Sequence, residues 1–347
     1  MMDRAAMMKE IRVEDAIGMV LAHDLTQIIP GKFKGRLFQK GHVIQQQDIP
    51  ALLSIGKEHI YILDVQQGYL HEDDAAIRLA KAAAGKLVEW TEPHEGKSNI
   101  VSRIHGLAKI DKRFVDQVNR LGEIALATIP NNTVVHPSDK LAGTRVIPLL
   151  VEEEKVIQVE QLAQSRNADI ENGQAWGHAG NGPIEVKPFK SLRVGLITTG
   201  NEVYHGRIED KFGPKVEEKL SAFGSRVVEQ RLVPDHVEEI VKQIRHFAEQ
   251  GVDMILLTGG MSVDPDDRTP GAIKRAGAEI VSYGTPMLPG SMLLMAYLKD
   301  TPILGLPGCV MHDPHTSFDV LLPRICAGER ITADEIADMG YGGLYSC

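Results

Sequence analysis

The chain is poor in cysteine and lacks long apolar runs. It has three cysteines in 347 residues, and they form no CxxC pair, so a disulfide framework is not expected. No apolar run approaches the roughly 20 residues that a membrane span needs. The charged first residues also lack the apolar centre of a signal peptide. These absences predict a cytoplasmic protein with no membrane partner.

Positive charge is scarce relative to negative charge. The 38 Lys and Arg residues against 47 Asp and Glu give a net charge of −9. Such a surface repels polyanions, so no nucleic-acid partner is expected. A small phosphate remains compatible, because backbone amides and a helix N-terminus hold it locally. The length allows two or three domains of ordinary globular composition.

The first half of the chain predicts two small α+β regions, residues 1–65 and 66–163. In the first of them, residues 43–63 indicate a strand, a helix and a strand. Asp48 is a candidate N-cap for that helix, and Gly56 follows it.

In the second region, residues 72–127 are expected to be helical, above all 72–85 and 111–123. Residues 144–163 indicate two strand-like runs on either side of an acidic turn. The polar stretch 164–190 is expected to be a linker.

From residue 191 the pattern becomes a regular alternation of strands and helices. Expected strands are 192–200, 226–233, 253–260, 278–284, 292–298 and 301–308, and expected helices are 214–224, 236–251 and 269–277. This alternation predicts an α/β domain over residues 191–330, with a doubly wound, mostly parallel sheet and helices on both faces. Residues 331–347 are expected to be a C-terminal tail.

Ligands of such sheets bind beyond the carboxyl ends of the strands. Residues suited to ligand contact follow four of the expected strands: Thr199, Gly200, Asn201, Glu202, Asp235, Thr258, Gly259, Gly260, Met261, Ser262, Pro307 and Gly308. Because the strands run parallel, these loops are expected to open on one edge. Plain turn chemistry at 200–202, and a helix cap at Asp235, are alternatives for two of them.

The loop TGGMSVDPDDRTP, residues 258–270, is the most informative of these. Gly259 and Gly260 let the backbone approach a ligand. Thr269 is a candidate N-cap, and the helix after it would turn its positive end toward a phosphate. Asp267 is the candidate for holding a divalent cation or for acid–base catalysis. A tight strand–helix turn with an ordinary cap is the alternative.

A second group of residues lies near the C-terminal end of the domain. Cys309, His312 and His315 are close in sequence, which is a weak signal for a metal site. A loop that faces the ligand is the favoured interpretation.

These motifs carry a resemblance. Residues 192–327 resemble the molybdopterin-binding domain shared by molybdopterin adenylyltransferases and molybdopterin molybdotransferases. TGGMSVDPDDRTP matches the GG–S–D–T signature of that domain, and Asp267 falls where the family has its catalytic aspartate. LPGSM at 288–292 and GLPGC at 305–309 resemble the PGKP and GLPGNP elements, which adds Pro289, Gly290 and Ser291 to the expected cofactor-binding residues.

The resemblance implies an enzyme of molybdenum-cofactor biosynthesis that is similar to the molybdotransferases. Its ligand would be molybdopterin, a pterin phosphate, with Mg²⁺ at Asp267 and with molybdate. It also implies a homo-oligomer, and a molybdoenzyme or other cofactor-assembly proteins as partners. In the first half, residues 13–25 and 35–63 resemble the molybdotransferases.

Departures from the family pattern favour a second hypothesis, a non-catalytic molybdopterin carrier or sensor. The SAMDGY motif of the molybdotransferases is absent, Ser291 replaces the lysine of PGKP, and Cys309 replaces the asparagine of GLPGNP. A lost lysine removes a point charge that would hold phosphate or molybdate. A nucleotide pyrophosphatase of the competence-damage type, whose domain is similar, is the third hypothesis.

Overall fold

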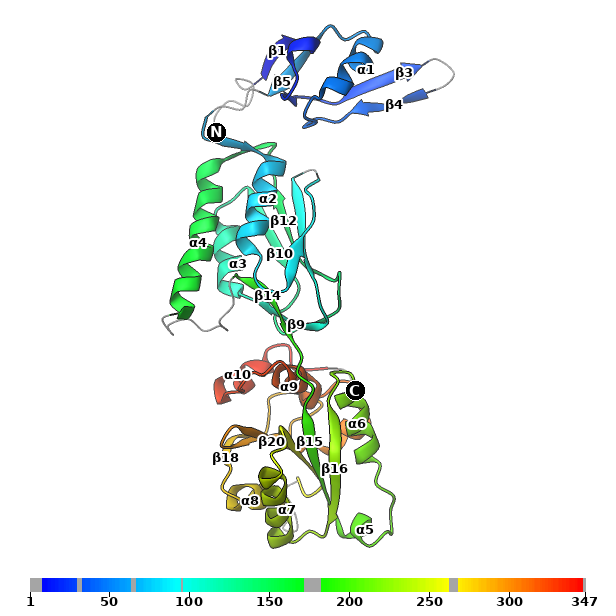
Figure 1. The fold of residues 1–347 in the computed structure, drawn as a ribbon, viewed down its shortest axis with the longest axis vertical. Coiled ribbons are helices and arrows are strands. Elements are labelled where there is room, and N and C mark those ends of the chain that lie inside the picture. The colour runs from blue at the N-terminus through cyan, green and yellow to red at the C-terminus, as the bar shows by residue number, and fades with distance from the viewer. Residues whose placement is uncertain are drawn as a thin grey trace. The chain divides into compact units, whose positions relative to one another are not determined.

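The computed structural model describes residues 8–29, 33–63, 67–94, 96–171, 182–261 and 268–345. Ser262 and Asp267, both expected in the site, lie outside these residues. The chain divides into two compact units (Figure 1). The first unit is Met1–Ile104, Ala108–Asn131 and His136–Val186, and the second is His105–Leu107, Asn132–Val135 and Lys187–Cys347. Within the described ranges, no helix has the length and apolar content to cross a bilayer.

The chain begins with a small α+β arrangement. Its elements are β1 (Met8–Arg12), η2 (Val13–Asp15), β2 (Val20–Leu21), β3 (Leu25–Ile29), β4 (Phe33–Phe38), η3 (Gln46–Asp48), α1 (Ile49–Ser54) and β5 (His59–Leu63). Strand β5 lies between β1 and β2 in an antiparallel sheet. The helix and the second strand expected over 43–63 are confirmed. The first strand is reduced to a single bridge between Val43 and Val20.

Asp48 does not cap α1 with its side chain, although it stands at the N-cap position. Its carboxylate instead accepts a hydrogen bond from the Gln45 N–H at 2.9 Å and lies 2.6 Å from His42 Nε2. The side chain therefore stabilises the turn before the helix.

The rest of the first half is more sheet-rich than expected. Its elements are β6 (Tyr69–His71), α2 (Glu72–Ala83), β7 (Val88–Trp90), β8 (Lys97–Ser102), β9 (Gly106–Ile110), α3 (Lys112–Arg120), β10 (Ile124–Thr128), β11 (Val134–Val135), β12 (Lys140–Val146), β13 (Leu150–Glu152), α4 (Glu153–Glu171) and β14 (Ile184–Pro188). The two helices singled out within residues 72–127 are present. The expectation that the whole stretch is helical is wrong, because four strands lie in it; three of them (β7, β8 and β10), joined by β12, form the sheet β10-β12-β8-β7.

The second strand-like run expected within 144–163 is wrong. Helix α4 begins at Glu153 and reaches Glu171, so it also occupies the first part of the stretch expected to be a linker. Val156, Val159 and Ala163 are buried along it. Their spacing of three and four residues places them on one helical face, and this period outweighs the β-branched composition.

The second unit contains the expected doubly wound sheet. Its elements are β15 (Arg193–Thr199), α5 (Asn201–Tyr204), α6 (Phe212–Ser221), β16 (Arg226–Val233), α7 (Val237–Glu249), β17 (Met254–Thr258), α8 (Thr269–Arg275), β18 (Glu279–Tyr283), β19 (Leu294–Leu298), β20 (Thr301–Leu306), η4 (Gly308–Met311), α9 (Ser317–Cys326), α10 (Ala333–Ala337) and η5 (Asp338–Gly340). The strand order is β16-β15-β17-β20-β19-β18. The first four strands are parallel, and β19 is antiparallel to both of its neighbours.

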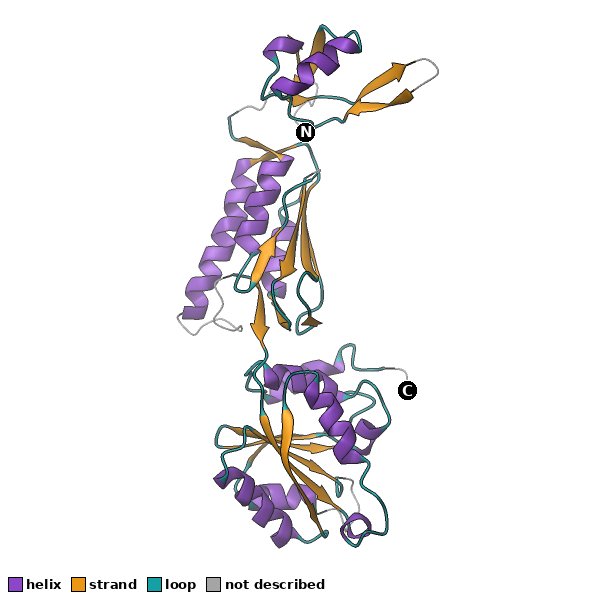
Figure 2. Ribbon diagram, turned by 45° about the vertical axis from the view of Figure 1, so that its right-hand side comes forward, coloured by secondary structure: helices purple, strands orange, loops and turns teal. Residues whose placement is uncertain are grey.

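Helices cover both faces of this sheet (Figure 2). Along β17, Met254 and Leu256 pack with α6 and α9 on one face. Ile255 and Leu257 pack with α7 and α8 on the other face. Because successive side chains of a strand point to opposite faces, a strand buried on both sides is a continuous apolar run. The predicted fold class of this region is confirmed.

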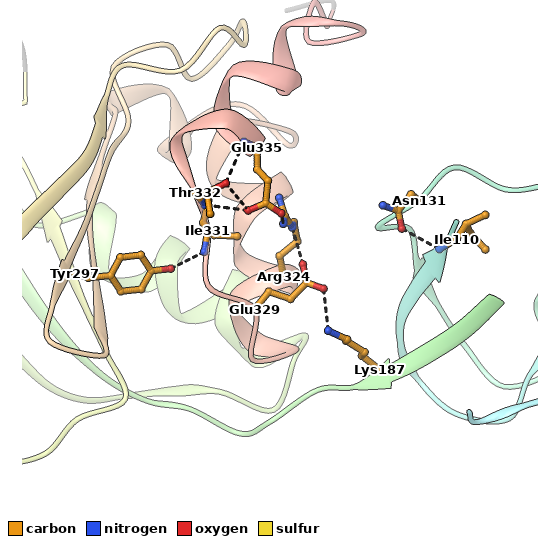
Figure 3. A network of polar contacts seen from close by, with 9 residues as sticks. All are labelled: Ile110, Asn131, Lys187, Tyr297, Arg324, Glu329, Ile331, Thr332 and Glu335. Carbon is orange, nitrogen blue, oxygen red and sulfur yellow. Dashed lines mark hydrogen bonds and ion pairs between the residues drawn. The ribbon is translucent and has the colours of Figure 1, made fainter. Parts of the chain in front are cut away.

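A buried ion network holds the last helices on the domain (Figure 3). The Arg324 guanidinium on α9 donates to Glu329 at 2.9 Å and to Glu335 on α10. Lys187 donates to the other Glu329 oxygen at 3.3 Å. Residues after 330, expected to be a tail, therefore include part of the folded domain, and Ile336 is buried in its core.

Candidate functional site

The parallel strands of the second unit end at one edge. The register pairs Thr198 on β15 with Thr258 on β17, and Thr258 with Leu306 on β20. The turns that begin at Gly200, at Gly259 and after Leu306 therefore leave the sheet at the same level. The prediction that these loops share one edge is confirmed.

A cavity of about 770 Å³ lies at this edge. It is lined by Phe212, Gly259, Gly260, Met261, Leu288, Pro289, Gly290, Ser291, Met292, Leu306, Pro307, Gly308, Cys309, Leu344 and Tyr345. This volume lies within the range of ordinary small-molecule sites, which is about 300–1,000 Å³. The GG, LPGSM and LPGC motifs, distant in sequence, thus meet around one hollow.

Gly259 and Gly260 follow β17 and form one wall. Both have positive φ, +86° and +57°, a region that glycine adopts freely. A Cβ atom on Gly259 would lie 2.2 Å from the Thr199 carbonyl oxygen. The turn therefore packs directly on the end of β15, and only glycine fits there.

Thr199 carries an unsatisfied hydroxyl beside this wall. Its side chain is buried, and its Oγ1 has no hydrogen-bond partner among the described residues. A Cβ atom on Gly259 would stand 2.8 Å from this oxygen. Because buried polar groups are almost always hydrogen-bonded, the Thr199 hydroxyl is a candidate ligand contact.

Thr269 does not have its expected role. It is the first residue of α8, and the N-cap position is Arg268. The Thr269 hydroxyl donates to the Gly259 carbonyl at 2.9 Å. The side chain therefore fixes the glycine turn from behind and does not cap its own helix.

The LPGSM loop forms a second wall. Gly290 has φ +120°, and a Cβ atom there would lie 2.6 Å from the Ser317 nitrogen at the start of α9. The Thr285 and Ser317 hydroxyls both donate to the Gly290 carbonyl, at 2.9 and 2.7 Å. This loop is thus anchored on α9, which leaves Pro289 and Ser291 on the cavity.

The residues after β15 and β16 lie at the same edge but do not line the cavity. Asp235 Oδ2 accepts a hydrogen bond from the Asn201 N–H at 3.1 Å. The cap of α7 is His236, without a side-chain bond, so the alternative of a helix cap at Asp235 is wrong. Asp235 instead joins the two loops. Gly200, Glu202 and Thr258 are likewise absent from the lining among the described residues.

The Cys/His loop does not form a metal site in the part of the chain that the structure describes. No group of three or more His, Cys, Asp or Glu side chains is placed to hold an ion there. Cys309 lines the cavity, whereas the His315 ring packs on Tyr345 with centroids 4.3 Å apart. His312 is exposed. These three side chains are therefore not gathered around one point in the described structure, and a metal at this loop stays a prediction.

The electrostatics of the cavity are unusual for an anion site. Among its described lining residues there is no Lys, Arg, Asp or Glu. Among these described residues, backbone amides and hydroxyls are the groups that could hold a phosphate. Lys219 on α6 is engaged elsewhere, by Asp319 at 2.6 Å.

Six lining residues are new with respect to the predicted set. They are Phe212, Leu288, Met292, Leu306, Leu344 and Tyr345. Leu288 and Met292 are the first and last residues of the LPGSM motif, and Leu306 lies in the GLPGC motif, so the motifs themselves already indicated these three positions. Phe212, Leu344 and Tyr345 belong to no motif, and only the tertiary structure brings them to the cavity.

Comparison with known proteins gives two family matches. Residues 195–327 match a family described as "Probable molybdopterin binding domain". Residues 10–64 match a domain of unknown function, DUF8806. The first match covers β17, β20, the glycine turns and the LPGSM loop at the cavity, but not Leu344 and Tyr345.

Individual relatives are similar over part of the chain. A CinA-like protein of Mycobacterium tuberculosis is 37% identical over 92 residues, which are 26% of this chain and 21% of that protein. The chain thus spans about a fifth of the length of the curated relatives it matches.

Two solved structures are also similar. The molybdopterin biosynthesis enzyme MoaB of Thermus thermophilus is 26% identical, with a TM-score of 0.33, over 40% of this chain and 98% of that one. The molybdopterin biosynthesis Mog protein of Mycobacterium ulcerans is 21% identical, with a TM-score of 0.33, over 42% and 100%.

The resemblance indicated by the strand-end motifs is confirmed by the family match. Residues 195–327, in the second unit, are similar to the family of probable molybdopterin binding domains.

Proposed function

We propose that the second unit binds molybdopterin in the cavity at the carboxyl edge of its sheet, and that the chain acts in molybdenum-cofactor biosynthesis. The observation that carries the proposal is the meeting of three glycine-containing turns around one cavity of about 770 Å³. The family match supports the same ligand class.

The described residues fit a phosphate-bearing ligand. The Gly259–Gly260 turn offers backbone without side chains, and the buried Thr199 hydroxyl beside it has no described partner. Ser291 adds a second hydroxyl on the opposite motif. Hydrogen bonds from such fixed donors to an anion are stronger than those between neutral groups.

The proposed stage is molybdate insertion or adenylyl transfer. Asp267 would act at the cation or in proton transfer, with Mg²⁺ and molybdate as the implied co-reactants. The test compares molybdate-dependent conversion by the wild-type chain and by Asp267→Asn. We expect the variant to lose most turnover, and equal rates would remove Asp267 from the reaction.

Binding itself has a separate test. The full chain is purified from cells that make molybdopterin and is examined by native mass spectrometry, which we expect to show one bound pterin phosphate per chain. Cells blocked in pterin synthesis provide the control. A chain that carries no pterin when purified from producing cells would contradict the proposal.

A carrier or sensor is the second candidate. It is favoured by the absence of charged side chains from the described lining and by Ser291 in place of the family's lysine. It predicts retention of molybdopterin with no turnover, by the wild type as well as by Asp267→Asn.

A nucleotide pyrophosphatase is the third candidate, favoured by the similarity to CinA-like proteins. Hydrolysis of ADP-ribose in the presence of a divalent metal, without pterin binding, would identify it.

A further inference from the structure

The segment Gly343–Tyr345 is attached to the LPGSM loop by backbone pairing. The Leu288 N–H donates to the Gly343 carbonyl at 2.9 Å, and the Tyr345 N–H donates to the Leu288 carbonyl at 2.8 Å. Leu288 and Leu344 form a parallel bridge. The segment thus extends a binding loop by one short strand, which places Leu344 and Tyr345 on the cavity.

The position of the segment is set by Gly343. A Cβ atom on this residue would lie 2.3 Å from the Met339 carbonyl oxygen and 2.8 Å from the Pro286 carbonyl oxygen. The chain therefore passes too close to two backbone oxygens for any other residue. The Tyr345 ring also rests against His315.

Large apolar groups stay exposed at this rim. Leu288 is 53% exposed, Leu344 81% and Tyr345 42%. Isolated exposed apolar residues are ordinary, but a cluster of them around a cavity marks a place where apolar surface is covered by a ligand or partner. The exposed side chains of Leu288, Leu344 and Tyr345 continue into a cavity that is also lined by Phe212 and Met292.

The lining indicates which ligand covers this surface. A small oxyanion such as phosphate or molybdate gains nothing from aromatic or aliphatic walls. A ligand that joins an anionic group to a flat fused ring uses both the glycine turns and the apolar rim. Flat heterocycles bind aromatic side chains by stacking, and this contributes about 1–3 kcal/mol for a nucleic-acid base.

We infer that the Gly343–Tyr345 segment is a wall of the binding site, with Tyr345 as a specificity-determining residue that stacks on the fused ring of the ligand. The inference rests on the proposed function, since it takes the pterin of molybdopterin as that ring. It assigns ligand discrimination to a segment that carries no motif.

The test measures the affinity of the full chain for freshly extracted molybdopterin by equilibrium ultrafiltration under argon. Tyr345→Ala is expected to weaken binding about tenfold, as loss of one stacking contact predicts. Tyr345→Phe keeps the ring and should stay within about twofold of the wild type. Tyr341→Ala is the matched control, because Tyr341 is fully exposed and does not line the cavity.

Gly343→Ala provides a second variant that leaves Tyr345 in the chain. Displacement of the segment by the added Cβ should reproduce the loss seen with Tyr345→Ala. Inorganic phosphate serves as a competitor in each titration, and its affinity should be the same for all variants.

The outcomes separate the two proposals. A wild-type chain that does not bind molybdopterin overturns the proposed function, and this inference with it. A wild-type chain that binds, with Tyr345→Ala of equal affinity, overturns the inference alone. A Tyr345→Phe variant as weak as Tyr345→Ala also overturns it, because the hydroxyl and not the ring would then be the contact.

Discussion

The two units place their ion networks in different environments. In the first unit, Arg78 on α2 donates to Glu153 and Glu160 on α4 at 2.6 and 2.8 Å, and these side chains are 30%, 38% and 31% exposed. In the second unit, the Arg324 side chain is 5% exposed and that of Glu329 is fully buried. An Arg–Glu ion pair is thus partly exposed in the first unit and buried in the core of the second unit.

The difference in burial means that the two networks contribute differently to the stability of their units. Partly exposed pairs are screened by water and contribute little, so α2 and α4 must be held mainly by apolar packing. On α2 that packing comes from Ala75, Ala76, Leu79, Ala80 and Ala83, which are all buried. A buried pair cannot lose one partner without leaving an uncompensated charge. The network of α9 and α10 is therefore essential to the last part of the second unit.

The largest effect is expected for Glu329→Gln. It leaves the buried Arg324 guanidinium, with Lys187 beside it, short of its main negative partner. Loss of one member of a buried pair costs about 3–5 kcal/mol of unfolding free energy. Urea unfolding followed by circular dichroism measures the change, and Glu218→Gln is the control, because Glu218 makes an exposed pair with Lys215. A change for Glu329→Gln no larger than for Glu218→Gln would show that the network is not structural.

The next largest loss of stability is expected where alanine replaces a glycine that packs against the backbone of another strand. Gly259→Ala combines a φ of +86° with a Cβ 2.2 Å from the Thr199 carbonyl. Strain of this kind costs about 2–3 kcal/mol. Gly56 in the first unit has a similar φ of +76° but open space around it, so Gly56→Ala should cost about 1 kcal/mol. Urea unfolding of the two variants gives the comparison, and equal losses would show that the contact with Thr199 adds nothing.

The sequence predicted the second unit better than the first for a physical reason. Strands buried on both faces, such as Met254–Thr258, are continuous apolar runs bounded by turn residues. The short strands of the first unit expose one face, as β5 does with its alternating exposed and buried residues. Residues 156–163 of helix α4 have a β-branched composition that favours a strand, but their buried positions repeat every three to four residues, which is the period of a helix.

The candidate site was predictable as far as its motifs reach. The turns after β17 and β20 and the LPGSM loop carry glycine and proline at strand ends, so their meeting follows from parallel topology. The roles of Thr269 and Asp235 could not be predicted from the motifs, because both side chains form hydrogen bonds with residues distant in the sequence. Thr269 donates to the Gly259 carbonyl, and Asp235 accepts from the Asn201 N–H. Tyr345 could not be foreseen, since its place depends on pairing with Leu288, which is distant in the sequence.

A smaller effect is expected for Arg78→Met. The substitution keeps the apolar stem and removes the charge. Its partners are partly exposed, so the loss should be about 1 kcal/mol. Trp90 on β7 lies in the first unit, so its fluorescence during urea unfolding reports this unit. Lys112→Met is the control for an exposed pair between Lys112 and Asp116. A loss of the size expected for Glu329→Gln would contradict the distinction between surface and core networks.

The smallest effect is a pH dependence at the rim of the buried network. Burial by itself raises the pKa of Glu335, but the charge of Arg324 and hydrogen bonds from Thr332 and Arg324 hold it below its ordinary value on balance. A carboxyl whose folded pKa is depressed stabilises the fold above its unfolded pKa, about 4.3, and loses this contribution as the pH falls through the folded value.

Glu335→Gln should therefore destabilise the second unit at pH 7 and differ less from the wild type as the pH approaches 3. Urea unfolding followed by circular dichroism at pH 7, 5 and 3.5 measures this convergence. Glu218→Gln is again the control, because its pKa is lowered mainly by its exposed pair with Lys215 and its loss should be near zero at every pH. A difference between Glu335→Gln and the wild type that stays constant over this range would mean that Glu335 stabilises α10 through packing and hydrogen bonds, with no net contribution from its charge.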